Sequence, residues 1–244
     1  MDSKSTFEIL DNPIWNALNT RHLNLALSDP DNSVRVYPRD MLPMAGLKKL
    51  DKECAQTLSS MLEDGRRLGI CVSQVPELPD DLKIVMQFDT AQMIRKNPPE
   101  FFQSKITDPI VELQNQDIEQ MQALVDLTKP GPFTSRTIEF GNFYGIKRGE
   151  QLVAMAGQRM SMQNESVILT EVSGVCTHPD FQGKGYAREL VHKVSLAIEA
   201  RGEIPFLHVL AKNTGAIRSY TACGFTQRRI MQYLIIEKIE FSKR

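Results

Sequence analysis

The segment that decides the fold reads Val175-Cys176-Thr177-His178-Pro179-Asp180-Phe181-Gln182-Gly183-Lys184-Gly185-Tyr186-Ala187. An apolar, strand-like run enters a loop with two glycines, and the loop opens a helical pattern. Glycines let the backbone turn tightly and approach a ligand closely, and the unpaired amides at a helix start bind phosphate. Lys184 adds a positive charge at the same place. On the residues alone, the segment indicates a phosphate-binding loop, with a plain strand-to-helix connection as the alternative.

The residues around this segment predict a regular order of strands and helices. The helix stop Lys129-Pro130-Gly131-Pro132 and the hairpin signature Arg148-Gly149-Glu150 separate the elements. The predicted order is a strand and a helix, then three strands, then a helix, a strand, a helix and a final strand. The strands are predicted at 109–113, 143–146, 152–160, 167–177, 205–210 and 229–236, and the helices at 115–128, 186–200 and 214–222.

The loop resembles the acyl-CoA pyrophosphate loop of the GCN5-related N-acetyltransferase (GNAT) superfamily, whose pattern is Gln/Arg-x-x-Gly-x-Gly/Ala. Gln182, Gly185 and Ala187 occupy its three fixed places. The resemblance runs from Asp108 to about Ile236 and indicates a GNAT N-acetyltransferase domain at 104–244. A second block resembles that of the FR47-like branch and consists of Phe206-Leu207-His208-Val209, Asn213, Ala216-Ile217-Arg218-Ser219-Tyr220 and Gly224-Phe225.

The resemblance implies an α/β fold with a mixed, strongly bent sheet and helices on both faces. In the family, two adjacent parallel strands splay apart at their ends, and here these strands would be 167–177 and 205–210. The pantetheine arm of acetyl-CoA would lie in the gap and pair with the first of them partly as an added strand. The acetyl-CoA-binding residues that it implies are Val175, Cys176, Thr177, Gln182, Gly183, Lys184, Gly185, Tyr186, Ala187 and Asn213.

Catalytic residues also follow from the resemblance. Direct transfer from a thioester to an amine requires that the amine lose a proton, that a donor meet the oxyanion and that the thiolate be protonated. Tyr220 corresponds to the tyrosine that protonates the thiolate, and a backbone amide near Val175 is the expected oxyanion donor. Asn213 corresponds to the residue that orients the pantetheine arm, with a helix N-cap as its other role. Because the family transfers acyl groups directly, Cys176 is expected to pack rather than to act as a nucleophile.

Glu171 is the candidate general base. It lies eleven residues before Gln182, which is the spacing of the catalytic glutamate in histone-modifying members of the family. On a strand it would share a face with Ser173, Val175 and Thr177, because alternate residues point the same way. The alternatives are an ion-pair partner, a clamp for the substrate amine, or deprotonation of the amine through water.

Residues 1–103 form a separate α/β region in this interpretation. Asn97-Pro98-Pro99 forbids a continuing helix or central strand and marks the boundary. Residues 11–18 and 37–40 resemble the N-terminal region of some bacterial FR47-like proteins, which suggests a degenerate second GNAT-like half. We expect this region and the segment 127–142 to shape the acceptor site. Helices are predicted at 13–27 and 47–61, and strands at 34–37, 68–72 and 82–88.

Composition argues against several classes of protein. The net charge of −1 argues against general nucleic-acid binding. Residues 182–229 nevertheless hold eight Lys or Arg against three Glu, which suits a small anionic ligand or a solvated helix face. No apolar run of eighteen residues and no apolar signal core occur, so we expect a cytoplasmic protein without a membrane segment. No metal is expected, because no zinc-motif spacing relates Cys54, Cys71, Cys176 and Cys223.

The sequence thus predicts an enzyme that moves an acetyl or short acyl group from acetyl-CoA to a primary amine. The acceptor would be a small molecule or a peptide, and transfer would be direct, in a ternary complex. The alternative is a CoA-sensing or partner-binding module without catalysis, against which Tyr220 and Asn213 argue. No residue pattern indicates an oligomeric state.

Overall fold

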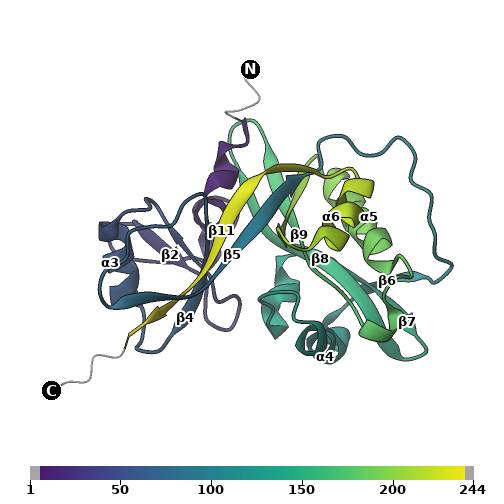
Figure 1. Cartoon of the computed structure of the whole chain (residues 1–244), viewed down its shortest axis with the longest axis horizontal. Coiled ribbons are helices and arrows are strands. Elements are labelled where there is room, and N and C mark those ends of the chain that lie inside the picture. Colours follow the sequence, from purple (N-terminus) through teal and green to yellow (C-terminus); the bar gives the residue numbers. More distant parts are fainter. Residues whose placement is uncertain (1–5, 240–244) are drawn as a thin grey trace.

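One mixed sheet of eight strands forms the centre of the computed structural model, which describes residues 6–239 (Figure 1). The strand order is β4-β11-β5-β10-β9-β8-β7-β6. β9 and β10 run parallel to each other, and the other neighbouring pairs are antiparallel. The predicted mixed α/β fold is therefore confirmed. The strands are β4 (Arg67–Val72), β5 (Leu82–Ile94), β6 (Ile110–Leu113), β7 (Phe143–Arg148), β8 (Gln151–Gln163), β9 (Ile168–Thr177), β10 (Ile204–Leu210) and β11 (Thr226–Lys238).

β5 comes from the first hundred residues but lies between β10 and β11 (Figure 1). It is longer than the predicted strand at 82–88, and its second half pairs with β10 from Thr90 to Ile94. Asp89, Thr90 and Gln92 interrupt the apolar pattern there, which is why the sequence does not indicate this extension. The sheet thus holds strands from both sides of the boundary predicted at 103/104. That boundary, and the degenerate second half, stay predictions.

Helices cover both faces of the sheet (Figure 1). α5 (Tyr186–Glu199) and α6 (Thr214–Ala222) pack on one face, in a core that includes Tyr144. α4 (Ile118–Thr128) packs on the other face, in a core that includes Phe143. Tyr144 and Phe143 are neighbours on β7, and neighbouring strand residues point to opposite faces.

The N-terminal residues form a smaller layer on the face opposite α5 and α6. Phe206 points to this layer, whereas Leu207 points to α5. The helix predicted at 13–27 ends at Asn19, and the one predicted at 47–61 begins at Lys52, because Asp51 caps it. The layer contains α2 (Pro13–Asn19), α3 (Lys52–Met61), β1 (Leu27–Ser28), β2 (Val34–Val36), β3 (Ala45–Leu47), η1 (Glu8–Asp11) and η2 (Leu23–Leu25), and further 3-10 turns elsewhere are η3 (Asn115–Asp117), η4 (Ser135–Phe140) and η5 (Pro179–Phe181).

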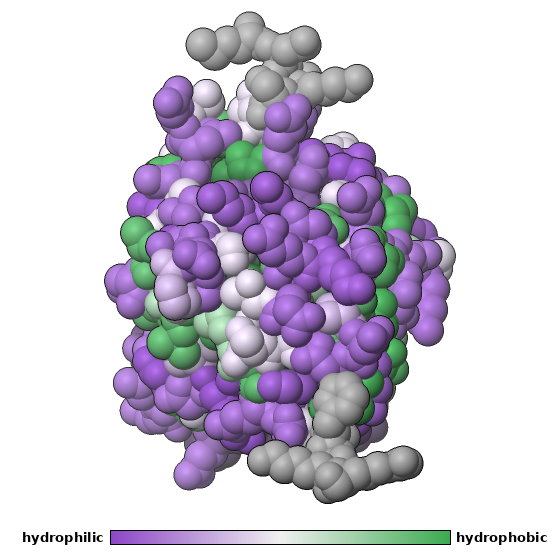
Figure 2. All heavy atoms as spheres, turned by 90° about the vertical axis from the view of Figure 1, so that its left-hand side faces the viewer, coloured by the Kyte–Doolittle hydropathy of each residue, from purple (hydrophilic) through white to green (hydrophobic). Residues whose placement is uncertain are grey.

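The outer face of the molecule on the side of α3 and β2 is mainly hydrophilic (Figure 2). Apolar side chains are scattered over it, as is normal on the surface of a globular protein. None of the helices in residues 6–239 combines the length and the apolar composition needed to span a membrane.

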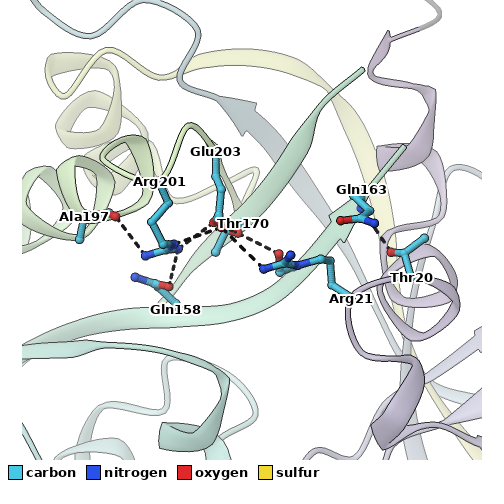
Figure 3. Close-up of polar contacts among 9 residues, drawn as sticks. Thr20, Arg21, Gln158, Gln163, Thr170, Ala197, Arg201 and Glu203 are labelled. Atoms are coloured by element: carbon cyan, nitrogen blue, oxygen red, sulfur yellow. Dashed lines mark hydrogen bonds and ion pairs between the residues drawn. The ribbon is translucent and has the colours of Figure 1, made fainter. Parts of the chain in front are cut away.

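A buried polar network ties the N-terminal layer to the starts of β9 and β10 (Figure 3). The Glu203 carboxylate accepts hydrogen bonds from Thr170 at 2.6 Å and from Arg201 at 2.7 and 3.1 Å. Arg21, just after α2, forms an ion pair with it at 3.8 Å. Burial alone would raise the pKa of Glu203, but Arg201 and Thr170 hold this pKa below its usual value.

We expect Glu203→Gln to destabilise the protein by about 1–3 kcal/mol at pH 7, because Arg201 and Arg21 lose their buried anion. The folded-state pKa of Glu203 lies below the unfolded value. Its stabilisation is therefore present at neutral pH and is lost as the pH falls through the folded pKa. Urea unfolding of both proteins should show a smaller difference at pH 4 than at pH 7.

Glu165→Gln is the matched control, since Glu165 lies exposed in the turn between β8 and β9. It should leave the free energy of unfolding unchanged at both pH values. Equal losses for the two variants, or a Glu203→Gln effect that does not vary with pH, would contradict this account of the network.

Candidate active site

A pocket opens where β9 and β10 part. The two strands pair only where Ile204–Phe206 meet Leu169–Glu171. Beyond this point β10 continues along β5, and β9 continues along β8. The cavity between them has a volume of about 970 Å³ and is lined by residues of both strands. The predicted splay of 167–177 and 205–210 is therefore present.

A β-bulge lies in β9 at the centre of this pocket. Gly174 and Val175 stand opposite a single residue of β8, because the register shifts between Ser173 and Cys176. Gly174 has φ +63°, and a Cβ atom there would lie 3.0 Å from a ring carbon of Phe143. A glycine therefore suits this position both by conformation and by space. The bulge leaves one residue out of the ladder and re-aims the backbone near Val175 towards the pocket.

The glycine loop forms one end of the pocket. Gly183 and Gly185 have φ +76° and +87°, and α5 begins directly after Gly185 without a side-chain cap. The first amides of α5 are thus free to bind an anion at a positive helix end. Lys184 and Gln182 line the pocket beside them, and their binding of acetyl-CoA stays a prediction.

Two further cations at this end were not identified from the sequence. Arg188 lies in the first turn of α5, and a cation this close to the glycine loop could have been noted from the sequence. Lys105 lies in the segment between β5 and β6, and its backbone N–H donates to Glu189 at 2.9 Å. A Cβ atom on Gly185 would lie 4.0 Å from that of Lys105. No local pattern could have found Lys105, because tertiary packing brings it to the loop.

Tyr186 and Cys176 also reach the pocket, but their side chains are buried. The Tyr186 hydroxyl donates to Asp108 at 2.7 Å and accepts from Arg148 at 3.2 Å, so it holds α5 to the strands beneath. A ligand would therefore meet Tyr186 through its backbone. Cys176 packs in the core beneath α4, as expected for a packing residue. Val175, Thr177 and Ala187 line the pocket as well.

Tyr220 and Asn213 approach the same space from α6. Burial raises the pKa of Tyr220, and the nearby Cys223 and Cys176 raise it further, so the phenol keeps its proton at neutral pH. Asn213 caps α6, since its Oδ1 accepts from the Ala216 N–H at 3.1 Å. This bond leaves the Asn213 amide N–H groups free to act as donors in the pocket.

Glu171 lies at the fork, at the last residue of β9 that pairs with β10. Its side chain is 1% exposed, and it accepts two hydrogen bonds from Arg159, at 2.8 Å from Nε and 3.0 Å from Nη2. Burial alone would raise its pKa, but Arg159 and His208 lower the pKa of Glu171 to about 2. This geometry is that of the ion-pair partner that the sequence left as an alternative. The general-base role stays a prediction.

His208 joins the pair from β10. Its Nδ1 lies 2.9 Å from Glu171, and its Nε2 lies 3.0 Å from the amide nitrogen of Gln92. The Gln92 oxygen accepts from Arg228 at 2.8 Å, and its nitrogen donates to the Leu10 carbonyl at 2.8 Å, which fixes the amide orientation. Burial alone would lower the pKa of His208, but Cys71 and Glu171 raise this pKa to about 10, so Nδ1 carries a proton and donates it to Glu171. The carboxylate is thus held by donors on two sides.

The far end of the pocket draws on segments distant in sequence. Met44, Phe88 and Thr90 come from the N-terminal residues, and Tyr233 comes from β11. The turn after α4, from Lys129 to Pro132, closes the same end. Residues of the N-terminal region and of the segment 127–142 both line the pocket, and their role in shaping the acceptor site stays a prediction. Within residues 6–239, no group of three His, Cys, Asp or Glu side chains is arranged to hold a metal ion.

The fold and this pocket define an acetyltransferase of the GNAT class, and the comparisons agree. A crystal structure from Novosphingobium aromaticivorans DSM 12444, described as an acetyltransferase from the GNAT family, is 34% identical to this chain. The match covers 95% of this chain and 99% of that one, with a TM-score of 0.84. The chain therefore belongs to the GNAT family. Within it, residues 143–234 match the family model described as FR47-like protein.

Two further structures share the fold along nearly the whole chain. A GCN5-related N-acetyltransferase from Kribbella flavida is 13% identical over 95% of this chain and 98% of that one, with a TM-score of 0.59. A GCN5-related N-acetyltransferase-like protein from Streptococcus suis 89/1591 is 15% identical over 91% and 92%, with a TM-score of 0.54. At these identities the likeness is one of fold. No curated protein matches the chain significantly.

Cys176 should react slowly with alkylating reagents in the folded protein. Burial raises the pKa of its thiol to about 11, against a weaker opposing effect of Thr128. Because the thiolate is the reactive form, we expect iodoacetamide at pH 7.5 to modify Cys176 about 100-fold more slowly than in the unfolded chain. Peptide mass spectrometry over time would measure both rates, and the folded-state rate should rise with pH up to pH 9. Rapid labelling at pH 7.5 would show a reactive thiol instead.

Proposed function

We propose that this protein transfers an acetyl or short acyl group from acetyl-CoA to a primary amine, directly, in a ternary complex. The observation that carries the proposal is that one pocket joins the glycine loop at the start of α5, an unpaired stretch of β9 and the phenol of Tyr220. We further propose a cytoplasmic location, as the sequence predicts.

The pocket suits the chemistry of CoA along its length. Lys105, Lys184 and Arg188 surround the glycine loop, where the pyrophosphate would meet amides and cations together. From the bulge to Thr177, β9 has no strand partner on the side facing β10. The amides of a pantetheine arm would satisfy that free edge as an added strand does, and Asn213 would orient the arm.

The proposed transfer is a balanced exchange of one acyl group. The amine nitrogen attacks the thioester carbonyl carbon, and a backbone amide near Val175 donates to the oxyanion that forms. The carbon–sulfur bond then breaks, and the sulfur takes the proton of the Tyr220 hydroxyl. Tyr220 is afterwards reprotonated from solvent. Burial keeps the Tyr220 phenol protonated at neutral pH, so the proton that the departing sulfur takes up is present in the pocket.

Removal of the amine proton has two routes in this proposal. Glu171, the base that the sequence predicts, has a pKa of about 2, and both its oxygens accept hydrogen bonds. Such a carboxylate takes up a proton poorly. We therefore favour deprotonation through water, with Glu171 acting as a positioning residue that holds Arg159.

Gly185→Val should weaken acetyl-CoA binding. A side chain there would occupy the space where the pyrophosphate meets the backbone, and the loss of one charge-assisted hydrogen bond corresponds to roughly tenfold to hundredfold in affinity. Titration calorimetry with acetyl-CoA measures the effect. Gly202→Val is the control, since Gly202 has a similar φ of +74° and lies outside the pocket. Unchanged acetyl-CoA affinity in Gly185→Val would show that CoA does not bind at this loop.

Tyr220→Phe should lower kcat by roughly 10²-fold, the effect typical of losing a general acid, with little change in acetyl-CoA affinity. Release of free thiol in the presence of an acceptor amine measures the rate. Tyr144→Phe is the control, because it removes a phenol hydroxyl from the same core without touching the pocket. Acetyl-CoA binding without acylation of any amine would instead favour the CoA-sensing module.

A further inference from the structure

The pocket carries positive charge at both ends. Lys105, Lys184 and Arg188 lie at the glycine loop, where the CoA phosphates are proposed to bind. Arg159 lies away from that loop, because its partner Glu171 stands at the fork eleven residues before Gln182, and Lys129 lines the pocket from the turn after α4. Among the described residues that line the cavity, none is an aspartate or a glutamate. CoA phosphates would pair with the first group of cations. In the second group, Arg159 already pairs with Glu171 through Nε and Nη2 and keeps only Nη1 for a further ligand.

Arg159 is held in one orientation with one side free. Its Nε and Nη2 atoms donate to Glu171, and Nη1 has no hydrogen-bond partner in residues 6–239. The side chain is 11% exposed and lines the pocket, so the N–H groups of Nη1 are the ones available to a ligand. Glu171 is itself held by His208. The guanidinium is therefore pre-organised, which lowers the entropy lost when it binds a second anion.

The residues that line the pocket near Arg159 limit the kind of molecule that can carry the bound anion. Met44, Phe88 and Tyr233 make this end of the pocket partly apolar. A polyamine or a lysine-rich peptide would bring several cations into a space with no acidic lining, which costs electrostatic energy. A small amine that also carries a carboxylate matches both the apolar surface and the free Nη1 of Arg159, since arginine favours planar carboxylates.

We infer that the acceptor is an amino acid, whose amine is acylated while its carboxylate pairs with Arg159. This inference rests on the proposed acyltransferase function. Glu171, which holds Arg159, lies four residues before Val175, or about 13 Å along β9. Because the Arg159 guanidinium is held at Glu171, most of this distance falls to the acceptor, which favours amino acids whose amine and carboxylate lie several bonds apart. The separation between amine and carboxylate therefore determines which amino acids fit.

The test begins with a spacing series. Glycine, β-alanine, 4-aminobutanoate and L-phenylalanine are each compared with the corresponding amide, and spermidine serves as a polycationic amine. Free thiol release from acetyl-CoA is followed for each. We expect at least one acid to exceed its amide in kcat/KM by roughly tenfold to hundredfold, the range for one charge-assisted hydrogen bond. Spermidine should be a poor acceptor.

Arg159→Lys tests the proposed contact without removing the positive partner of Glu171. A lysine ammonium that pairs with Glu171 lacks the second face that a guanidinium offers. The preference for acid over amide should therefore fall about tenfold or more, mainly through KM for the acid. Arg201→Lys is the matched control, because Arg201 pairs with Glu203 through Nε and Nη2 in the same way and lies outside the pocket. It should keep the preference.

Thermal unfolding of the CoA-bound protein, with and without each acid, separates this inference from the proposed function. Stabilisation by an acid in the parent but not in Arg159→Lys supports the carboxylate contact even if no amine is acylated, an outcome that would overturn the acyltransferase function alone. Equal turnover of acids, amides and spermidine would overturn the amino-acid inference and leave the acyltransferase standing. An unchanged acid preference in Arg159→Lys, or the absence of both preference and stabilisation, would also overturn it.

Discussion

The short overlap between β9 and β10 is the constraint on which the pocket depends. Three residues of each strand pair, and beyond them each strand keeps a partner only on its outer side. The facing edges then carry backbone N–H and C=O groups that are not used within the sheet. Such groups are costly to leave without partners away from water. The free edges therefore favour a ligand that offers amides of its own.

The fork between the strands also determines where buried charge lies. A carboxylate at 1% exposure is tolerated only when it is paired and hydrogen-bonded, and Glu171 has Arg159 and His208 for this purpose. At the glycine loop Arg188 is partly buried and paired with Glu189, but Lys105 and Lys184 are exposed. Their attraction for an anion will weaken with salt, whereas that of the sheltered Arg159 will weaken much less. One pocket thus combines a region where salt strongly weakens anion binding with a region where salt weakens it little.

Local patterns in the sequence predict the part of the site that local structure builds. The glycine loop, the helix that follows it, Asn213 and Tyr220 all lie within continuous strand–loop–helix units, and the structure brings them to one pocket. Most predicted elements of the second half begin or end within a few residues of the observed ones.

The residues that sequence reasoning missed reach the site through long-range pairing. Arg159 lies beside an irregularity in β8, between Gln158 and Ser161, where a simple alternation of faces does not apply. Met44 and Thr90 come from segments whose position depends on β5 entering the sheet. The ion pair of Glu171 with Arg159 could not be predicted, because the partner of a strand residue cannot be read from that strand alone.

The place of β5 between β10 and β11 has a consequence for how the chain acquires its structure. Gln92 and His208 contact each other across 116 residues of sequence. In a nascent chain, β5 is exposed long before β10 and β11 have been synthesised. The edges of β5 therefore stay unpaired while the chain is only partly folded. Non-local pairing of this kind slows folding and leaves strand edges open to other chains. The glutamine, aspartate and threonine side chains along β5 would then have a second role, because they reduce aggregation of the unpaired strand until β10 and β11 have been synthesised.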